Sequence, residues 1–321
     1  MKTIDQRNSS LDVMKCLSAF MVVLIHYNKV SGECGLLYSE IIRSIARSAV
    51  PFFFMVTGYY LPVIVDKGKL NRQISRVLIL AIGSTAFYLL FNLISAGSFS
   101  SALDYMNTHY TKGTLFSWIV LNDDPAGYHL WYLYGLFYSL VFYAVLYRLK
   151  LHAFIPFLTF FMLLALFVAN YTETVFTRNY LLGIPCIGCG VMVRKYKIEF
   201  GKKQVLLIFM SICFVVAEML FARNRFGKSF DIYTFNVPLA LCMLTGAINN
   251  PTIGKGTVWA VIGMKLSAYI YIFHVFVDNM IGRIIDYDSV FSQVSRPFVV
   301  FVSSVLFSYF YVKVKDMFHG A

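Results

Sequence analysis

Charged residues are scarce in this chain of 321 residues, since Asp, Glu, Lys and Arg make up only 14% of it and hydrophobic residues make up 59%. A soluble globular domain carries about 25% charged residues, so an ordinary soluble fold is excluded. Apolar runs of roughly 15 to 20 residues recur along the whole sequence, and each can cross or nearly cross a bilayer core of about 30 Å. We therefore expect an all-α, polytopic membrane protein.

Other features are also missing. The six cysteines mostly lie inside apolar segments, where they behave as small hydrophobic residues, so no disulfide framework is expected. Cys186 and Cys189 form a C-x-x-C sequence in a Gly-rich apolar segment, where close helix packing is a better explanation than redox or metal chemistry. Internal repeats, Pro-rich linkers and low-complexity tracts are not apparent. We expect a single transmembrane domain over residues 1–321 and no soluble domain.

About ten segments are expected to span the membrane: 12–30, 49–65, 77–96, 129–147, 153–169, 179–193, 205–221, 231–248, 266–284 and 297–314. A shorter apolar piece, Val258 to Met264, precedes the ninth segment and is expected to lie at the interface or to re-enter the membrane. The chain has a net charge of +12, and most of its Lys and Arg residues fall on one side of the expected spans. This pattern predicts that both termini are cytoplasmic and that the loop 97–128 is outside. Membrane orientation and anionic lipids account for the charge, so no nucleic-acid partner is expected.

The first apolar segment carries a basic residue and a histidine on one face. Lys15 and His26 are eleven residues apart, and at about 100° per residue they point within about 20° of each other. The helical rise separates them by roughly 16 Å, which places Lys15 near a membrane surface and His26 inside it. Asp12 lies on the same side, about one turn before Lys15. A histidine within a membrane indicates a functional site, although His26 alone could also bond a neighbouring helix.

Two further groups of residues lie around the third and fourth segments. Arg72 and Arg76 are four apart on one helical face, one turn after Lys69, and guanidinium groups at a helix start suit phosphate. Positive-inside anchoring would produce the same cluster. His129 and Trp131 begin the fourth segment, where Trp131 is typical of an interfacial anchor and His129 could face the outer mouth of a cavity.

The ninth segment holds His274 and Asp278, four residues apart. At this spacing the carboxylate can hold one tautomer of the imidazole or share its proton. Two ionisable groups this deep seldom face lipid, so they form either a functional pair or a structural ion pair. Tyr269 and Tyr271 lie on the same segment.

Taken together, these residues resemble the acyltransferase-3 family of integral membrane acyltransferases. The family has a basic residue, ten intervening residues and a His in its first helix, which is similar to Lys15 and His26 here. An aromatic run ending in Ser-Gly-Tyr resembles 52–59, and the later motifs resemble Arg72 with Arg76, His129-x-Trp131-x-Leu133, and a Tyr-rich helix ending at His274. Arg is commoner than Lys at the position of Lys15, and the two arginines are usually closer together.

The resemblance implies an O-acyltransferase of the bacterial cytoplasmic (inner) membrane. It would move an acyl group, usually acetyl from cytoplasmic acetyl-CoA, to a hydroxyl of a cell-surface carbohydrate or lipid-linked glycan. It implies no metal. The expected catalytic residues are His26, Lys15, His274 and Asp278; the expected donor-binding residues are Arg72, Arg76 and Lys69; and the expected acceptor-binding residues are His129, Trp131 and Tyr269.

Four questions stay open at this point. A proton-coupled transporter of a small amino acid or an exporter of polysaccharide would also need buried His26, His274 and Asp278. A sensor or assembly partner without chemistry would tolerate substitution of His26 and Arg72. The loop 97–128 either reads a sugar or forms a solvated cap, and the sequence does not decide whether the protein is a homo-oligomer.

Overall fold

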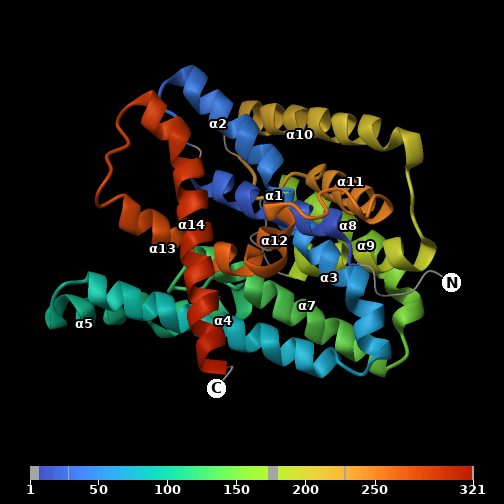
Figure 1. Ribbon diagram of the computed structural model, residues 1–321, viewed down its shortest axis with the longest axis horizontal. Coiled ribbons are helices and arrows are strands. Elements are labelled where there is room, and N and C mark those ends of the chain that lie inside the picture. Colours follow the sequence, from blue (N-terminus) through green and yellow to red (C-terminus); the bar gives the residue numbers. More distant parts are fainter. Residues whose placement is uncertain (1–6, 28, 173–179, 228, 320–321) are drawn as a thin grey trace. The chain divides into compact units, whose positions relative to one another are not determined.

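The computed structural model describes residues 7–27, 29–172, 180–227 and 229–319. Within these ranges every regular element is a helix (Figure 1). The α-helices are α1 (Ser9–Tyr27), α2 (Glu33–Ala46), α3 (Ala49–Asp66), α4 (Leu70–Ser95), α5 (Phe99–His109), α6 (Lys112–Leu121), α7 (Trp131–Arg148), α8 (Ile155–Tyr171), α9 (Tyr180–Tyr196), α10 (Gln204–Phe226), α11 (Asn236–Asn249), α12 (Val258–Lys265), α13 (Ser267–Ile281) and α14 (Val290–His319). Short 3₁₀ helices are η1 (Tyr128–Leu130), η2 (His152–Phe154) and η4 (Gly201–Lys203).

Seven helical stretches in the described part of the chain are long and apolar enough to cross a membrane, and an eighth is added if α12 and α13 form one bent span. The expected count of ten is therefore not confirmed. Helices occupy the other expected positions, but α9, α11 and α13 have only 17, 14 and 15 residues. At about 1.5 Å per residue, 14 residues reach roughly 21 Å, which is shorter than the bilayer core. The expected segments 12–30 and 179–193 also contain residues 28 and 179, which lie outside the described residues.

The apolar piece before the ninth segment is a separate helix, α12, which is bent by 81° from α13. This break agrees with the expectation of an interfacial or re-entrant piece. The expected loop 97–128, in contrast, is not irregular, because it folds into α5 and α6, which are capped by Ser98 and Thr111. Helix α2 was not expected, since its 14 residues are amphipathic rather than continuously apolar.

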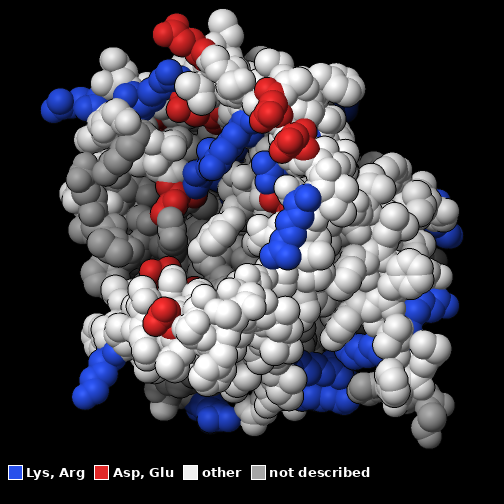
Figure 2. All heavy atoms as spheres, turned by 90° about the vertical axis from the view of Figure 1, so that its left-hand side faces the viewer, with Lys and Arg blue, Asp and Glu red and all other residues white. Residues whose placement is uncertain are grey.

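Much of the surface is apolar, as a lipid environment requires. Figure 2 shows one face of the protein, on which wide areas carry neither basic nor acidic side chains. On α8, for example, Phe157 and Phe160 are each 64% exposed. In water such a surface would cause aggregation, so these side chains are best explained by contact with lipid tails.

The chain divides into two compact units, Met1–Val56 with Tyr196–Ala321, and Thr57–Lys195. In the first unit α1 packs against α12, α13 and α14 around a core that includes Ala19, Val23, Ile270 and Val300. The closest approach is at Gly263 of α12, where a Cβ atom would come within 1.8 Å of the Asp12 carbonyl oxygen. Only glycine allows the two backbones to meet there.

In the second unit α4 packs against α7, and α3 enters the unit at Thr57. Gly58 lies against the backbone of α9, because a Cβ atom there would come within 2.0 Å of the Ile187 carbonyl oxygen. The neighbouring Cys186 and Cys189 are buried free thiols. Thr57 and Gly58 of α3 thus pack against the segment of α9 that contains the C-x-x-C sequence, and the small residues on both sides allow this close approach.

Candidate active site

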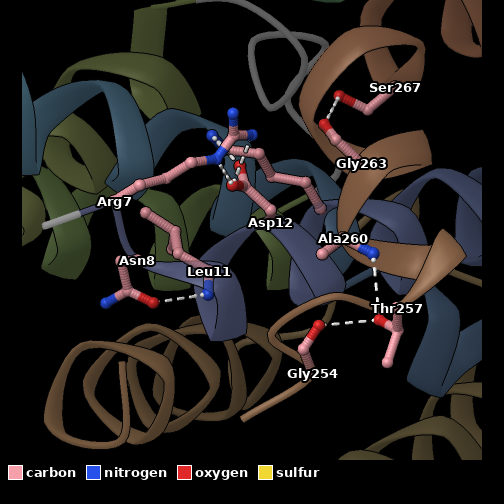
Figure 3. A network of polar contacts seen from close by, with 10 residues as sticks. Arg7, Asn8, Leu11, Asp12, Gly254, Thr257, Ala260, Gly263 and Ser267 are labelled. Atoms are coloured by element: carbon pink, nitrogen blue, oxygen red, sulfur yellow. Dashed lines mark hydrogen bonds and ion pairs between the residues drawn. The ribbon is translucent and has the colours of Figure 1, made fainter. Parts of the chain in front are cut away.

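The N-terminal end of α1 is held by polar contacts. The Asn8 side-chain oxygen accepts a hydrogen bond of 2.8 Å from the Leu11 amide, which is the usual contact of a helix N-cap. The Ser9 amide donates to the Pro251 carbonyl at 2.9 Å. Figure 3 shows this end of α1 beside α12, whose own first turn is capped by Thr257. The start of α1 is therefore fixed against the chain that precedes α12.

Asp12 binds two basic side chains one turn into α1. Nε and Nη2 of Arg7 both donate to Asp12 Oδ2, at 2.8 and 2.7 Å (Figure 3), and Lys15 Nζ lies 3.3 Å from Oδ1. The Asp12 side chain is only 8% exposed, whereas that of Arg7 is 51% exposed. Two positive charges thus meet one negative charge, and the excess charge is accessible. Such a cluster suits a further anion such as a phosphate group.

His26 lies near the other end of α1, and His274 of α13 lies beside it. The centroids of their rings are 5.2 Å apart and the rings are inclined by 33°. His274 is completely buried, while His26 is only partly buried. His274 Nδ1 is 2.7 Å from the Tyr271 carbonyl oxygen, which can only accept, so Nδ1 carries the hydrogen and Nε2 has the lone pair of the neutral ring. The more accessible histidine is therefore supported by one that is fixed in orientation.

Arg43 of α2 and Tyr27 complete the surroundings of His26. Arg43 Nε donates a hydrogen bond of 2.8 Å to the carbonyl oxygen of Ile25, in the last turn of α1. A cation at this position satisfies an orphan carbonyl and interacts favourably with the C-terminal end of the helix dipole. The Tyr27 ring lies 6.0 Å from the rings of both His26 and His274. These contacts hold the end of the helix that carries His26.

Asp278 forms a bidentate ion pair with Arg296 of α14. Arg296 Nε is 2.8 Å from Asp278 Oδ1, and Nη2 is 2.5 Å from Oδ2. The guanidinium also lies over the rings of Tyr27 and Tyr287, at 5.3 and 4.7 Å from their centroids. The sequence left open whether Asp278 and His274 form a functional pair or a structural ion pair. Both Asp278 oxygens engage Arg296, and the Tyr271 carbonyl fixes the imidazole.

The basic residues expected to bind a donor lie at the start of α4, in the second unit. Lys69 is the residue before α4, and Arg72 and Arg76 follow on its first two turns. All three are exposed, and among the described residues none of them forms an ion pair. Their charge is thus available to an anion.

His129 and Trp131 lie at the start of α7. His129 is buried in η1, with its ring edge-on to Tyr88 of α4 at 4.7 Å between centroids. Trp131 is half-buried, and its carbonyl oxygen accepts a hydrogen bond of 2.7 Å from the Asn122 amide group. His129 is therefore packed inside the second unit. This position fits a structural role as well as the expected acceptor-binding role.

Asp124 is a buried carboxylate close to His129 along the chain, and the sequence alone predicted no separate role for it. Asp124 accepts hydrogen bonds from the Thr85 hydroxyl and, at 2.9 Å, from the Ala126 amide, and Thr85 also contacts the Tyr134 hydroxyl at 2.9 Å. Burial raises the pKa of the Asp124 carboxyl, although these hydrogen bonds act in the opposite direction. Nothing in the local pattern Asp-Asp-Pro shows which aspartate is buried.

Two other polar residues, Tyr269 and Glu218, form hydrogen bonds within the first unit. The Tyr269 hydroxyl accepts a hydrogen bond of 3.0 Å from Lys315 Nζ of α14, away from His274 by more than one turn of α13. Glu218 of α10 accepts from the amides of Thr234 and Phe235, at 2.9 and 3.2 Å, just before α11 begins. A carboxylate at a helix N-terminus stabilises that helix.

Comparison with known proteins gives the family of the chain. A family described as an acyltransferase domain, the acyltransferase-3 family, matches residues 8–313, nearly the whole chain. No curated protein and no solved structure matches the chain significantly. The chain belongs to the acyltransferase-3 family. Together with its apolar helices, this makes the protein a membrane acyltransferase.

The sequence predicts some of the residues that the structure brings together around His26, and not others. It placed Lys15 and His26 on one helix, and the structure adds His274 beside His26. It did not identify Arg43 or Arg296 as part of the site. A signal existed for Arg296, because a buried Asp278 in an apolar helix requires a basic partner. Among the described residues, no three His, Cys, Asp or Glu side chains are grouped to hold a metal ion.

Proposed function

We propose that this acyltransferase moves an acetyl group from cytoplasmic acetyl-CoA to a hydroxyl of a cell-surface carbohydrate or lipid-linked glycan, in the bacterial cytoplasmic membrane. The observation that carries the proposal is the pair of histidines at the end of α1, one of them accessible and the other buried and fixed. An imidazole with a pKa near neutrality is the usual general base for a hydroxyl nucleophile. The family supplies the reaction class.

His26 would act on the acceptor. It takes the hydroxyl proton while the oxygen forms a bond to the thioester carbonyl carbon, the carbon–sulfur bond breaks, and the thiol leaves with a proton. His274 would position the His26 ring and exclude water, since it is itself buried among Tyr27, Tyr271 and the core of the first unit. Arg43 would keep the end of α1, and so His26, in place.

The phosphates of the donor would meet the excess positive charge at the other end of α1. Arg7 and Lys15 together outnumber the charge of Asp12, and Arg7 is half exposed. In the second unit, the exposed Arg72 and Arg76 are a separate candidate for phosphate, since guanidinium groups bind it through paired N–H donors. About 16 Å of helix separates Lys15 from His26. This separation suits a long donor whose phosphates lie far from its thioester.

The test is transfer of label from acetyl-labelled acetyl-CoA, with purified protein in membranes that contain the native glycan lipids. We expect His26→Gln to lower the rate by about 10²- to 10⁴-fold, which is the usual contribution of a general base. His152→Gln is the matched control, because His152 is an exposed histidine stacked on Tyr147. It should transfer label at the wild-type rate.

A folded His26→Gln variant that transfers label as fast as wild type would contradict the assignment of His26. If folded wild-type protein transfers no label with the acceptors present, acetyl transfer itself is wrong. Counterflow of labelled substrate in vesicles without acetyl-CoA would then test for transport.

A further inference from the structure

An apolar cavity, referred to below as the groove, lies on the face of α1 that points away from Lys15. It has a volume of about 550 Å³ and is formed in the first unit by α1, α12 and α14. Its walls are apolar, and they include Val13, Phe20, Trp259, Phe298, Val302 and Leu306. Val13 is two residues before Lys15, so at about 100° per residue the two side chains point roughly 160° apart. The groove is therefore separate from the Asp12 cluster and the histidine pair.

The groove opens to the surroundings of the protein rather than into its core. Trp259 is 53% exposed, and Phe298, Val302 and Leu306 are each 56% exposed. These residues belong to α14 and to the bent pair of α12 and α13, which have the length and composition of membrane spans. Hydrocarbon is thus the medium that the groove meets.

The shape of the groove favours a single hydrocarbon chain over a protein helix. Its wall on α1 runs from Val13 to Phe20, which is about 10 Å along the helix and comparable with one leaflet of a bilayer core, about 15 Å. Helices in membranes dock through Gly, Ala and Ser, which let backbones approach. The groove is lined instead by aromatic and branched side chains, with Cys16 as its smallest residue.

A lysine follows directly after the residue that packs on one end of the groove. Gly254 packs on Val13, since a Cβ atom on Gly254 would lie 2.4 Å from Val13 Cγ2. The next residue, Lys255, is exposed, and among the described residues it forms no ion pair. A cation near the membrane surface attracts an anionic lipid headgroup. The Val13 end therefore suits a phosphate, and the groove suits the tail attached to it.

We infer that this groove binds an anionic phospholipid, with one acyl chain between α1, α12 and α14 and with the headgroup at Lys255. The site is independent of the proposed acyl transfer. It would hold α12 against α1 from the lipid side.

Trp259 provides a direct test, because it is one of only three tryptophans and lines the groove. With Trp118 and Trp131 replaced by Phe, the protein is placed in vesicles that contain equal mole fractions of dibrominated phosphatidylglycerol or dibrominated phosphatidylcholine. Brominated chains quench tryptophan on contact. We expect the anionic lipid to associate at least threefold more strongly than the neutral one.

Two pairs of variants test the parts of the site separately. Lys255→Gln should abolish the preference for the anionic lipid, whereas Lys202→Gln, which changes an exposed lysine elsewhere in the unit, should keep it. Val302→Phe fills the groove and should at least halve the quenching. Val299→Phe changes an exposed α14 residue outside the groove and should leave the quenching unchanged.

Equal quenching by the two lipids, or a Val302→Phe variant that is quenched as wild type, would overturn the proposal. It would also be overturned if Trp259 were shielded from both lipids in a protein that sediments as a dimer, since a second copy would then cover the groove. None of these results depends on transferase activity.

Discussion

Two buried carboxylates of the first unit, Asp12 and Asp278, both bind basic side chains, yet they do so differently. Asp278 uses both oxygens for one guanidinium, at 2.8 and 2.5 Å, and the pair has no net charge. Asp12 faces two cations, Arg7 and Lys15, of which Arg7 is half exposed. This cluster therefore has a net positive charge. A basic residue is available to a ligand where cations outnumber carboxylates. We therefore propose that the Asp12 end binds the donor and that the Asp278 end is structural.

The largest effect is expected at the ion pair of Asp278 and Arg296. Asp278→Ala leaves Arg296 partly buried without its carboxylate, which should destabilise the protein by about 3–5 kcal/mol. Thermal unfolding in detergent measures this loss. The double variant Asp278→Leu with Arg296→Met removes both charges and should recover most of the stability. A single variant as stable as wild type would show that the pair is not structural.

The next effect concerns the contact that holds the Asp12 segment. Gly263→Ala places a methyl group against the Asp12 carbonyl oxygen and should cost about 1–3 kcal/mol, because two backbones must separate. Gly83→Ala is the control, since no atom lies within 4 Å of the added carbon in that helix. It should be neutral or slightly stabilising. If both variants unfold at the same temperature, the close approach of α12 to α1 is wrong.

A smaller effect is expected at the cluster of Arg7, Asp12 and Lys15. Lys15→Met should raise the KM for acetyl-CoA about tenfold, which corresponds to about 1.4 kcal/mol of a charge-assisted hydrogen bond. Its effect on stability should stay under about 1 kcal/mol, since Arg7 still pairs with Asp12. Lys15→Arg should keep the KM near that of wild type. A loss of stability as large as that of Asp278→Ala would remove the difference between the two carboxylates.

Asp124 extends the comparison to a buried carboxylate that, among the described residues, has no basic partner. Burial raises the pKa of its carboxyl above the ordinary value of 3.8, so the folded state binds a proton more tightly than the unfolded state. This contribution to stability is present below the ordinary pKa and is lost as the pH rises through the higher folded value.

The expected result is a stability that falls less steeply in Asp124→Asn than in Asp123→Asn as the pH rises above the ordinary pKa of 3.8. Asp123 is the exposed neighbour of Asp124 and therefore the matched control. Unfolding midpoints in detergent at each pH give the comparison. Identical pH profiles of the two variants would contradict the raised pKa.

Local patterns in the sequence predicted what depends on neighbours along the chain. The spacing of Lys15 and His26 placed them on one helix, and the separate apolar piece before the ninth segment is α12. Contacts between distant elements could not be read in this way. Asp278 pairs with Arg296 of the next helix rather than with His274 one turn before it. Arg43 contacts α1 from α2, a helix that was expected to be a loop because its sequence is not continuously apolar. Hydropathy alone also does not register that α11 ends after 14 residues, so the expected count of ten spans is not confirmed.

We propose that α1 binds the donor near Lys15 and performs proton transfer at His26. Equilibrium binding of labelled acetyl-CoA without acceptor tests this division of roles most directly. We expect the His26→Gln variant to bind the donor with the wild-type Kd and the Lys15→Met variant to bind it about tenfold more weakly. Loss of donor binding in His26→Gln, with wild-type binding in Lys15→Met, would contradict this division of roles along the helix.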